Sequence, residues 1–138
     1  MHYLYFTGQL LLAIILGGML GWQRVAIGKM AGPRTYALVS VGSALFTILS
    51  INAFGVETGR VAAQIVTGIG FLGVGVIIHK HKLNGDIIVG LTTAAGLWAT
   101  AAIGMAIGVG WLIESCIASF LILIVLLFNE KKYINKSL

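Results

Sequence analysis

Few residues in the apolar stretches of this 138-residue sequence could do chemistry. Gln64 can hydrogen-bond across helices or contact a ligand. Glu114 follows Trp111 by three residues, so its carboxylate, which would cost about 3 kcal/mol near a bilayer centre, can reach the interface. One face of a predicted helix adds three hydroxyl residues: Ser40, Ser43 and Thr47. These side chains are the candidates for an ion or solute path.

The residue sets of known catalytic and metal sites are missing. The sequence has no Cys/His cluster with ligand spacing, no phosphate-binding glycine loop, and no Ser, His and Asp that could be held together. His79 and His81 lie among lysines, whose positive field repels a metal ion. Four acidic residues are too few for a carboxylate Mg²⁺ site in one chain, and the single Cys116 forms no intrachain disulfide. We expect no enzymatic activity, no metal site and no cofactor.

The densest polar segment is a predicted loop that leads into a helix. It contains three basic residues and a threonine: Arg24, Lys29, Arg34 and Thr35. The positive end of the helix adds to the basic charges, so an anion or a partner's carboxylate is favoured there. Contact with lipid phosphates explains the same charges. Partner docking and lipid anchoring are both compatible with this loop.

The elements that position these residues must be membrane helices. Apolar residues make up 59% of the chain and charged residues only 9%, whereas soluble domains carry about a quarter charged residues. The net charge of +5 lies mainly between apolar runs and in the tail, which is a topology pattern. We expect membrane lipids as neighbours and no nucleic-acid partner.

Five apolar stretches approach the roughly 20 residues that span a bilayer core of about 30 Å. They cover about residues 5–22, 35–54, 61–78, 88–107 and 111–128. Pro33 suits the first turn of the second helix, and a break at residues 108–110 divides the last long stretch. The sequence therefore predicts an all-α fold, a polytopic bundle of five transmembrane helices forming a single domain over residues 1–138.

Basic and non-basic loops alternate along the chain. With five spans every basic loop and the tail lysines Lys131, Lys132 and Lys136 lie on the cytoplasmic side, as the positive-inside rule favours. Four spans would place the tail lysines outside. We expect the N-terminus outside and the C-terminus in the cytoplasm.

Small residues recur along several predicted helices and form narrow seams. The seams contain Gly17 and Gly21, Gly68 and Gly73, and Thr92, Gly96, Thr100 and Gly104. Small side chains allow helix backbones to approach closely in lipid. The seams predict tight packing inside a subunit or within a homo-oligomer, and a conduction path along them is the alternative.

Three blocks resemble the MgtC/SapB family of bacterial inner-membrane proteins. The first is GKMAGPRT at 28–35 with LV at 38–39 and GSALFT at 42–47. The second is RVAAQIVTGIGFLGVG at 60–75, and the third is GLTTAA at 90–95 with LWATAAIG at 97–104. The match is ordered, covers most of residues 17–110 and is highly specific.

The resemblance implies a five-helix domain of the bacterial inner membrane, often followed by a soluble cytoplasmic domain. It implies a link to growth under magnesium limitation and to virulence inside host cells. The implied role is regulatory, through binding of membrane proteins such as the proton-translocating ATP synthase, instead of magnesium transport. Because the chain ends soon after the fifth span, we expect the soluble domain to be absent.

Three positions depart from the family pattern. Gln23 and Val25 stand where acidic residues usually or often flank the arginine that ends the first span. Glu57-Thr58-Gly59 precedes the third span in place of a frequent Asp-Pro, and Val89 replaces a frequent basic residue before Gly-Leu-Thr-Thr. If those charges serve the family's activity, this chain has an altered one.

Two functions follow as expectations. The first is a non-enzymatic membrane regulator that self-associates through its seams and docks a partner through the basic loop. The second is a small ion or solute transporter or channel, formed by a homo-oligomer, whose path uses the hydroxyl residues with Gln64 and Glu114.

Overall fold

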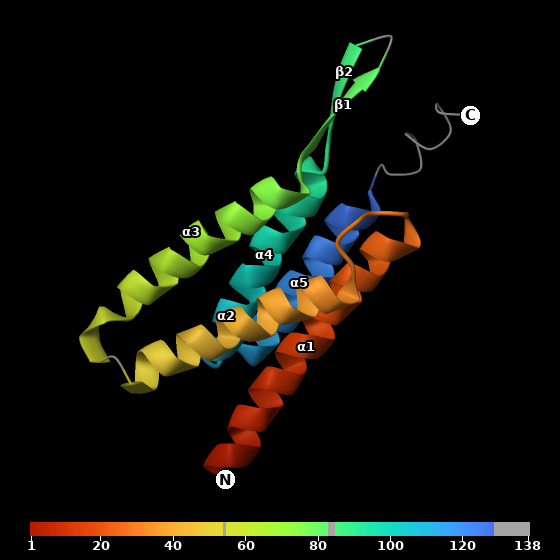
Figure 1. The fold of residues 1–138 in the computed structure, drawn as a ribbon. Coiled ribbons are helices and arrows are strands. Elements are labelled where there is room, and N and C mark those ends of the chain that lie inside the picture. The colour runs from red at the N-terminus through yellow and green to blue at the C-terminus, as the bar shows by residue number, and fades with distance from the viewer. Residues whose placement is uncertain (54, 83–84, 129–138) are drawn as a thin grey trace.

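Five α-helices account for most of the computed structural model, which describes residues 1–53, 55–82 and 85–128 (Figure 1). The helices are α1 (His2–Ala26), α2 (Pro33–Ala53), α3 (Thr58–Val76), α4 (Leu91–Gly108) and α5 (Leu112–Leu127). A short 3₁₀-helix, η1 (Gly55–Glu57), joins α2 to α3, and the strands β1 (Ile78–Lys82) and β2 (Gly85–Val89) join α3 to α4.

The helices confirm the predicted helical membrane bundle. Among the described elements, α1 to α4 are long and apolar enough to cross a membrane, while α5 is apolar but has only 16 residues. The observed helices lie within a few residues of the predicted spans, with two differences of consequence. The first helix continues to Ala26 instead of ending near residue 22, and the fourth begins at Leu91 instead of 88.

The chain between α3 and α4 is a β-hairpin, so the expectation of a purely α-helical fold is wrong at this connection. The strands pair antiparallel from Ile78 opposite Val89 to Lys82 opposite Gly85. The β-branched run 87–89 favours a strand over a helix start. Gly90 then turns the chain into α4 with a φ of 103°, and a Cβ at this residue would lie 2.0 Å from the Val76 carbonyl oxygen. Glycine is therefore required where the hairpin meets the bundle.

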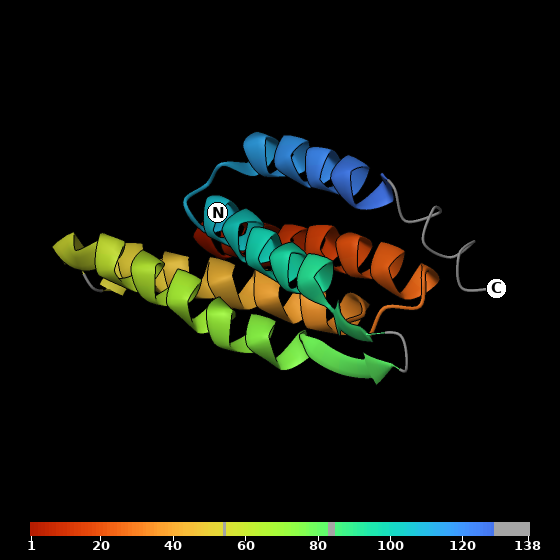
Figure 2. The same cartoon turned by 90° about the horizontal axis from the view of Figure 1, so that it is seen from above.

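Helix α2 lies at the centre of the bundle. It packs extensively against α1 and α4, whereas α3 packs mainly on α4 and touches α2 less. Figure 2 shows α3 and α5 on opposite sides of the other helices. The buried core lies where α1, α2 and α4 meet, around Ala13, Leu20, Tyr36, Leu97 and Ile107. Helices α3 and α5 correspondingly have few residues buried within the chain.

The bundle has two distinct ends. We call the end that carries the α1–α2 loop, the hairpin and the last turn of α5 the basic end, because Arg24, Lys29 and Arg34 lie there (Figure 1). The opposite end carries the start of α1, η1 and the α4–α5 turn. The tail lysines on which the topology prediction relies lie outside the described residues.

Candidate functional site

Arg24 lies inside the basic end of the bundle. Its side chain is fully buried, and its Nη2 donates a hydrogen bond to Thr93 Oγ1 at 3.1 Å. The Tyr36 hydroxyl, also fully buried, donates to the Thr93 carbonyl oxygen at 3.3 Å. Thr93 therefore links α1, α2 and α4.

The prediction that Arg24 lies in an exposed docking loop is wrong. Because α1 extends to Ala26, Arg24 is still helical and continues the buried stripe of Leu20 and Gly21. Its charge lies between helices, where a partner protein cannot contact it. The backbone of Arg24 contacts the loop, since the Lys29 amide donates a hydrogen bond to the Arg24 carbonyl oxygen at 3.0 Å.

The α1–α2 loop is packed onto the end of α1. Ala31 is 5% exposed, and a Cβ at Gly21 would lie 2.6 Å from the Gly32 carbonyl oxygen. Met30 and Arg34, the latter in the first turn of α2, nevertheless remain exposed, and Lys29 is half-buried. We call Lys29, Met30 and Arg34 the docking loop. Sequence reasoning missed Met30, whose signal was an apolar residue among basic ones.

The predicted seams separate into two groups. Four of their glycines lie at helix contacts so close that a Cβ would come within 3 Å of another residue: Gly17, Gly21, Gly96 and Gly104. Thr100 is also buried and donates to the Gly96 carbonyl oxygen. Gly68 and Thr92 are exposed, and a Cβ at Gly68 would meet nothing within 4 Å, while Gly73 faces Ala94 at an ordinary contact distance. The first group packs this chain, and Gly68 has no such role in it.

The five candidates for a polar path do not come together. Ser40 and Thr47 pack against glycines of neighbouring helices, since a Cβ at Gly17 or Gly108 would lie 2.8 Å or 2.6 Å from their Cβ atoms. Ser43 and Gln64 line a groove on the α3 side. Glu114 is exposed on α5, a helix that lies on the opposite side of the bundle from α3 (Figure 2). One chain therefore does not bring the predicted set into one path.

The groove lies between α2 and α3 and has a volume of about 1200 Å³. The two helices meet at η1 and separate towards the basic end (Figure 1). Apolar and small side chains make up most of the lining, which includes Gly42, Phe46, Gly68 and Leu72. Thr35 lies in the lining from the first turn of α2, and Glu57 and Arg60 from the opposite end. The groove thus follows both helices over much of the membrane-spanning length.

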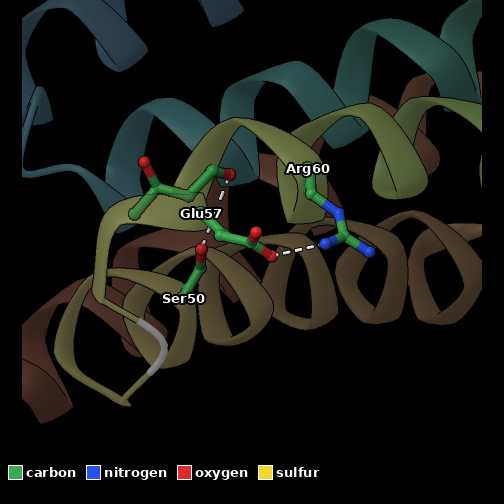
Figure 3. Close-up of polar contacts among 4 residues, drawn as sticks. Ser50, Glu57 and Arg60 are labelled. Carbon is green, nitrogen blue, oxygen red and sulfur yellow. Dashed lines mark hydrogen bonds and ion pairs between the residues drawn. The ribbon is translucent and has the colours of Figure 1, made fainter.

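Two polar contacts lie at the junction where the groove begins (Figure 3). Arg60 Nη1 lies 2.5 Å from Glu57 Oε2, with both side chains well exposed. The Ser50 hydroxyl donates to the Thr58 carbonyl oxygen at 3.5 Å and ties α2 to the start of α3. An exposed ion pair adds little stability, so this pair mainly neutralises charge at the rim.

Comparison with known proteins identifies the family to which this sequence belongs. The sequence model of the MgtC family matches residues 10–133. The chain belongs to the MgtC family. This confirms the resemblance inferred from the three sequence blocks. No solved structure matches the fold significantly.

Curated relatives of this MgtC family chain are about twice its length. An uncharacterized protein of Haemophilus influenzae is 41% identical over 89% of this chain and 54% of its own length. An Escherichia coli protein named "Putative magnesium transporter YhiD" is 47% identical over 76% of the chain and 51% of its length. Protein MgtC of Salmonella typhimurium is 44% identical over 83% of the chain and 48% of its length. The chain therefore spans about half of these relatives.

One departure from the MgtC family pattern has a local structural use. The Gln23 amide donates from Nε2 to the carbonyl oxygen of Leu126, near the end of α5, at 3.2 Å. A carboxylate accepts hydrogen bonds but cannot donate one, so an acidic residue at this position would lose the contact. Val25 and Val89 are exposed, and nothing in the structure explains their replacement of charged residues.

Proposed function

We propose that this MgtC family chain is a non-enzymatic regulator of the bacterial inner membrane, which binds membrane proteins during adaptation to low magnesium or host stress. The observation that carries the proposal is the docking loop. Met30 is 75% exposed and Arg34 is also exposed, while the same loop is fixed beneath by Ala31 and by Gly32 against Gly21. A rigid loop that exposes one apolar and one cationic side chain is suited to a partner, because little order must be gained on binding.

The proposal includes a topology of five spans. Helix α5 has 16 residues, about 24 Å of helix, and it is preceded by Trp111, whose side chain is suited to the interface. The basic end then faces the cytoplasm and the N-terminus lies outside. In this orientation the docking loop meets cytoplasmic segments of other membrane proteins.

The chemistry of the docking loop favours an acidic segment with an apolar residue beside it. The Arg34 guanidinium can bind a carboxylate with two parallel hydrogen bonds, and Met30 adapts to irregular apolar surfaces. The proton-translocating ATP synthase is the partner that we would test first. Lipid phosphates can bind the same cations, so lipid anchoring is the competing explanation for the basic residues of the docking loop.

Replacing Arg34 by alanine should reduce recovery of the ATP synthase about tenfold in a pull-down from detergent-solubilised membranes, since a charged hydrogen bond contributes on the order of 1.5 kcal/mol. Arg60→Ala is the matched control, because Arg60 is an exposed arginine at the opposite end. Equal recovery by wild-type protein and Arg34→Ala would count against the docking loop.

The alternative is a small ion or solute transporter or channel formed by a homo-oligomer. The observation that favours it is the name of the Escherichia coli relative, which refers to magnesium transport. Reconstituted alone in liposomes, the chain should give no Mg²⁺ flux if it is a regulator. Flux that Glu114→Ala reduces would favour the transporter and overturn the regulator.

A further inference from the structure

The lining of the groove between α2 and α3 changes in polarity from one end to the other. Two charged side chains, Glu57 and Arg60, lie at the η1 end, where the helices meet (Figure 3). Two uncharged polar side chains, Ser43 and Gln64, line the groove further along it. From there to Thr35 the lining is apolar, and it consists of Leu38, Val39, Gly42, Gly68, Ile69 and Leu72. A mostly apolar concave surface with a few convergent polar groups is the usual form of a ligand site.

Ser43 and Gln64, which we call the polar pair, lie at the same depth on the two facing helices. The Ser50 hydroxyl donates to the Thr58 carbonyl oxygen where α2 and α3 meet, so depth can be counted from this contact. Ser43 lies seven residues from Ser50, which is about 10 Å of helix. Gln64 lies six residues from Thr58, about 9 Å, and Arg60 lies two residues from it, about 3 Å. The polar pair is therefore about 6 Å deeper in the groove than Arg60.

Both members of the polar pair have hydrogen-bonding capacity that the chain does not use. Ser43 is 4% exposed and lines the groove, and no residue in the described part of the chain hydrogen-bonds its hydroxyl. The Gln64 amide likewise has no hydrogen-bond partner among the described residues. Because the bilayer core offers no bulk water in place of such a partner, a polar atom of a ligand at this depth is favoured.

Beyond the polar pair, the groove has the length of a lipid acyl chain. Eight residues of α2 separate Ser43 from Thr35, which is about 12 Å of helix. Eight residues of α3 likewise separate Gln64 from Leu72. The hydrocarbon of one leaflet is about 15 Å deep, half of a bilayer core of about 30 Å. An acyl chain whose ester carbonyl lies at the polar pair can thus follow the apolar lining over most of its length.

The charged end of the groove is complementary to a headgroup that carries both charges. Arg60 Nη1 lies 2.5 Å from Glu57 Oε2, and both side chains are more than half exposed. A guanidinium has five N–H donors and a carboxylate has two acceptor oxygens, so each side chain keeps capacity for a further contact. A phosphate beside Arg60 and an ammonium beside Glu57 would keep this end neutral, whereas an anionic headgroup would leave one negative charge in excess.

We propose that the groove binds one phosphatidylethanolamine molecule. Its phosphate contacts Arg60, its ammonium contacts Glu57, an ester carbonyl accepts hydrogen bonds from the polar pair, and an acyl chain follows the apolar lining. These parts of the lipid follow one another in the same order as the matching side chains of the groove. In the five-span topology this lipid belongs to the outer leaflet. The inference does not depend on the docking loop, which lies at the other end of α2.

Photo-crosslinking identifies the occupant directly. The purified chain is placed in phosphatidylglycerol vesicles with a trace of phosphatidylethanolamine that carries a diazirine on one acyl chain. Irradiation should label residues 38–42 and 68–72, as mapped by peptide mass spectrometry. Unlabelled phosphatidylethanolamine should compete about tenfold better than phosphatidylcholine, since choline has no N–H to donate and a charged hydrogen bond contributes on the order of 1.5 kcal/mol. Labelling spread evenly over all helices, or equal competition by the two lipids, would overturn the proposal.

Single substitutions test the positions assigned to the headgroup and the ester. Arg60→Ala should reduce labelling of residues 68–72 about tenfold, because it removes the charged contact with the phosphate. Ser43→Ala, which removes only a hydroxyl, should reduce labelling about fivefold, the effect of one hydrogen bond within a membrane. Arg34→Ala, at the basic end, should leave labelling unchanged. A loss in Arg34→Ala as large as in Arg60→Ala would place the headgroup at the basic end and refute the proposal.

Two glycine variants of α3 test the apolar part of the groove. Gly68→Leu should fill the groove and abolish labelling, while Gly70→Leu should be labelled like the wild type. Both glycines are exposed and have open space around a Cβ, but only Gly68 lines the groove. Thermal unfolding in detergent shows whether the two variants fold alike. Wild-type labelling of Gly68→Leu would refute lipid binding in the groove, and it would leave the docking loop proposal standing because the vesicles contain no partner protein.

Discussion

Adding one methyl group at Gly104 is expected to destabilise the bundle by about 3 kcal/mol, the upper part of the usual range for overpacking. The Cβ of Gly104→Ala would lie 2.1 Å from the Ser40 carbonyl oxygen and 2.9 Å from Ser43 Cβ. Neither the Ser40 backbone nor the buried Ser43 side chain can move far enough to make room for the methyl group, so α2 and α4 must separate. The measurement is thermal unfolding in detergent, followed by tryptophan fluorescence.

The effect should exceed that of a single clash because neighbouring contacts share the same helix. Gly108 of α4 and Gly17 of α1 also approach α2 closely, at Thr47 and Ser40. Gly70→Ala is the control, since its Cβ meets nothing within 4 Å and alanine favours a helix over glycine by up to about 1 kcal/mol. If Gly104→Ala unfolds at the temperature of Gly70→Ala, the α2–α4 contact is looser than described.

The sequence predicts the helices well because lipid imposes a simple rule. Each span must be apolar over the thickness of the bilayer, and a helix satisfies its backbone hydrogen bonds within itself. Hydropathy alone therefore locates the spans. Small residues at intervals of four also identify Gly17, Gly21 and Gly104 as sites of close approach. Spacing cannot say whether the facing helix belongs to the same chain, and for this reason Gly104 and Gly68 look alike in the sequence.

The sequence is less informative at the basic end, where charge patterns admit several structures. The run of lysines and histidines predicts a loop, yet the backbone of residues 78–82 pairs with 85–89 in a hairpin. The β-branched run 87–89 favours a strand, but the segment with which it pairs cannot be predicted from either strand alone. The same ambiguity affects the prediction of the candidate site, because a basic residue near a predicted helix end can lie inside the helix bundle or on its surface.

Arg24→Ala is expected to lower stability by about 3 kcal/mol or more, in the range for truncating a large buried side chain. The change removes a fully buried side chain and its hydrogen bond to Thr93 Oγ1, while the backbone hydrogen bond from Lys29 to residue 24 remains. Arg24→Lys should restore only part of the loss, since an ammonium lacks the planar fork of donors. The measurement is again thermal unfolding in detergent.

Arg34→Ala provides the contrast that separates folding from docking. Arg34 is exposed, so its removal should leave the unfolding temperature unchanged while it weakens partner binding. Thr93→Val, which keeps the volume but removes the hydroxyl that accepts from Arg24, should cost about 1 kcal/mol, and its effect should largely disappear in the Arg24→Ala background. Should Arg24→Ala fold as well as Arg34→Ala and still lose the partner, Arg24 would belong to the docking surface after all, and its burial between α1 and α4 would not describe the state that binds.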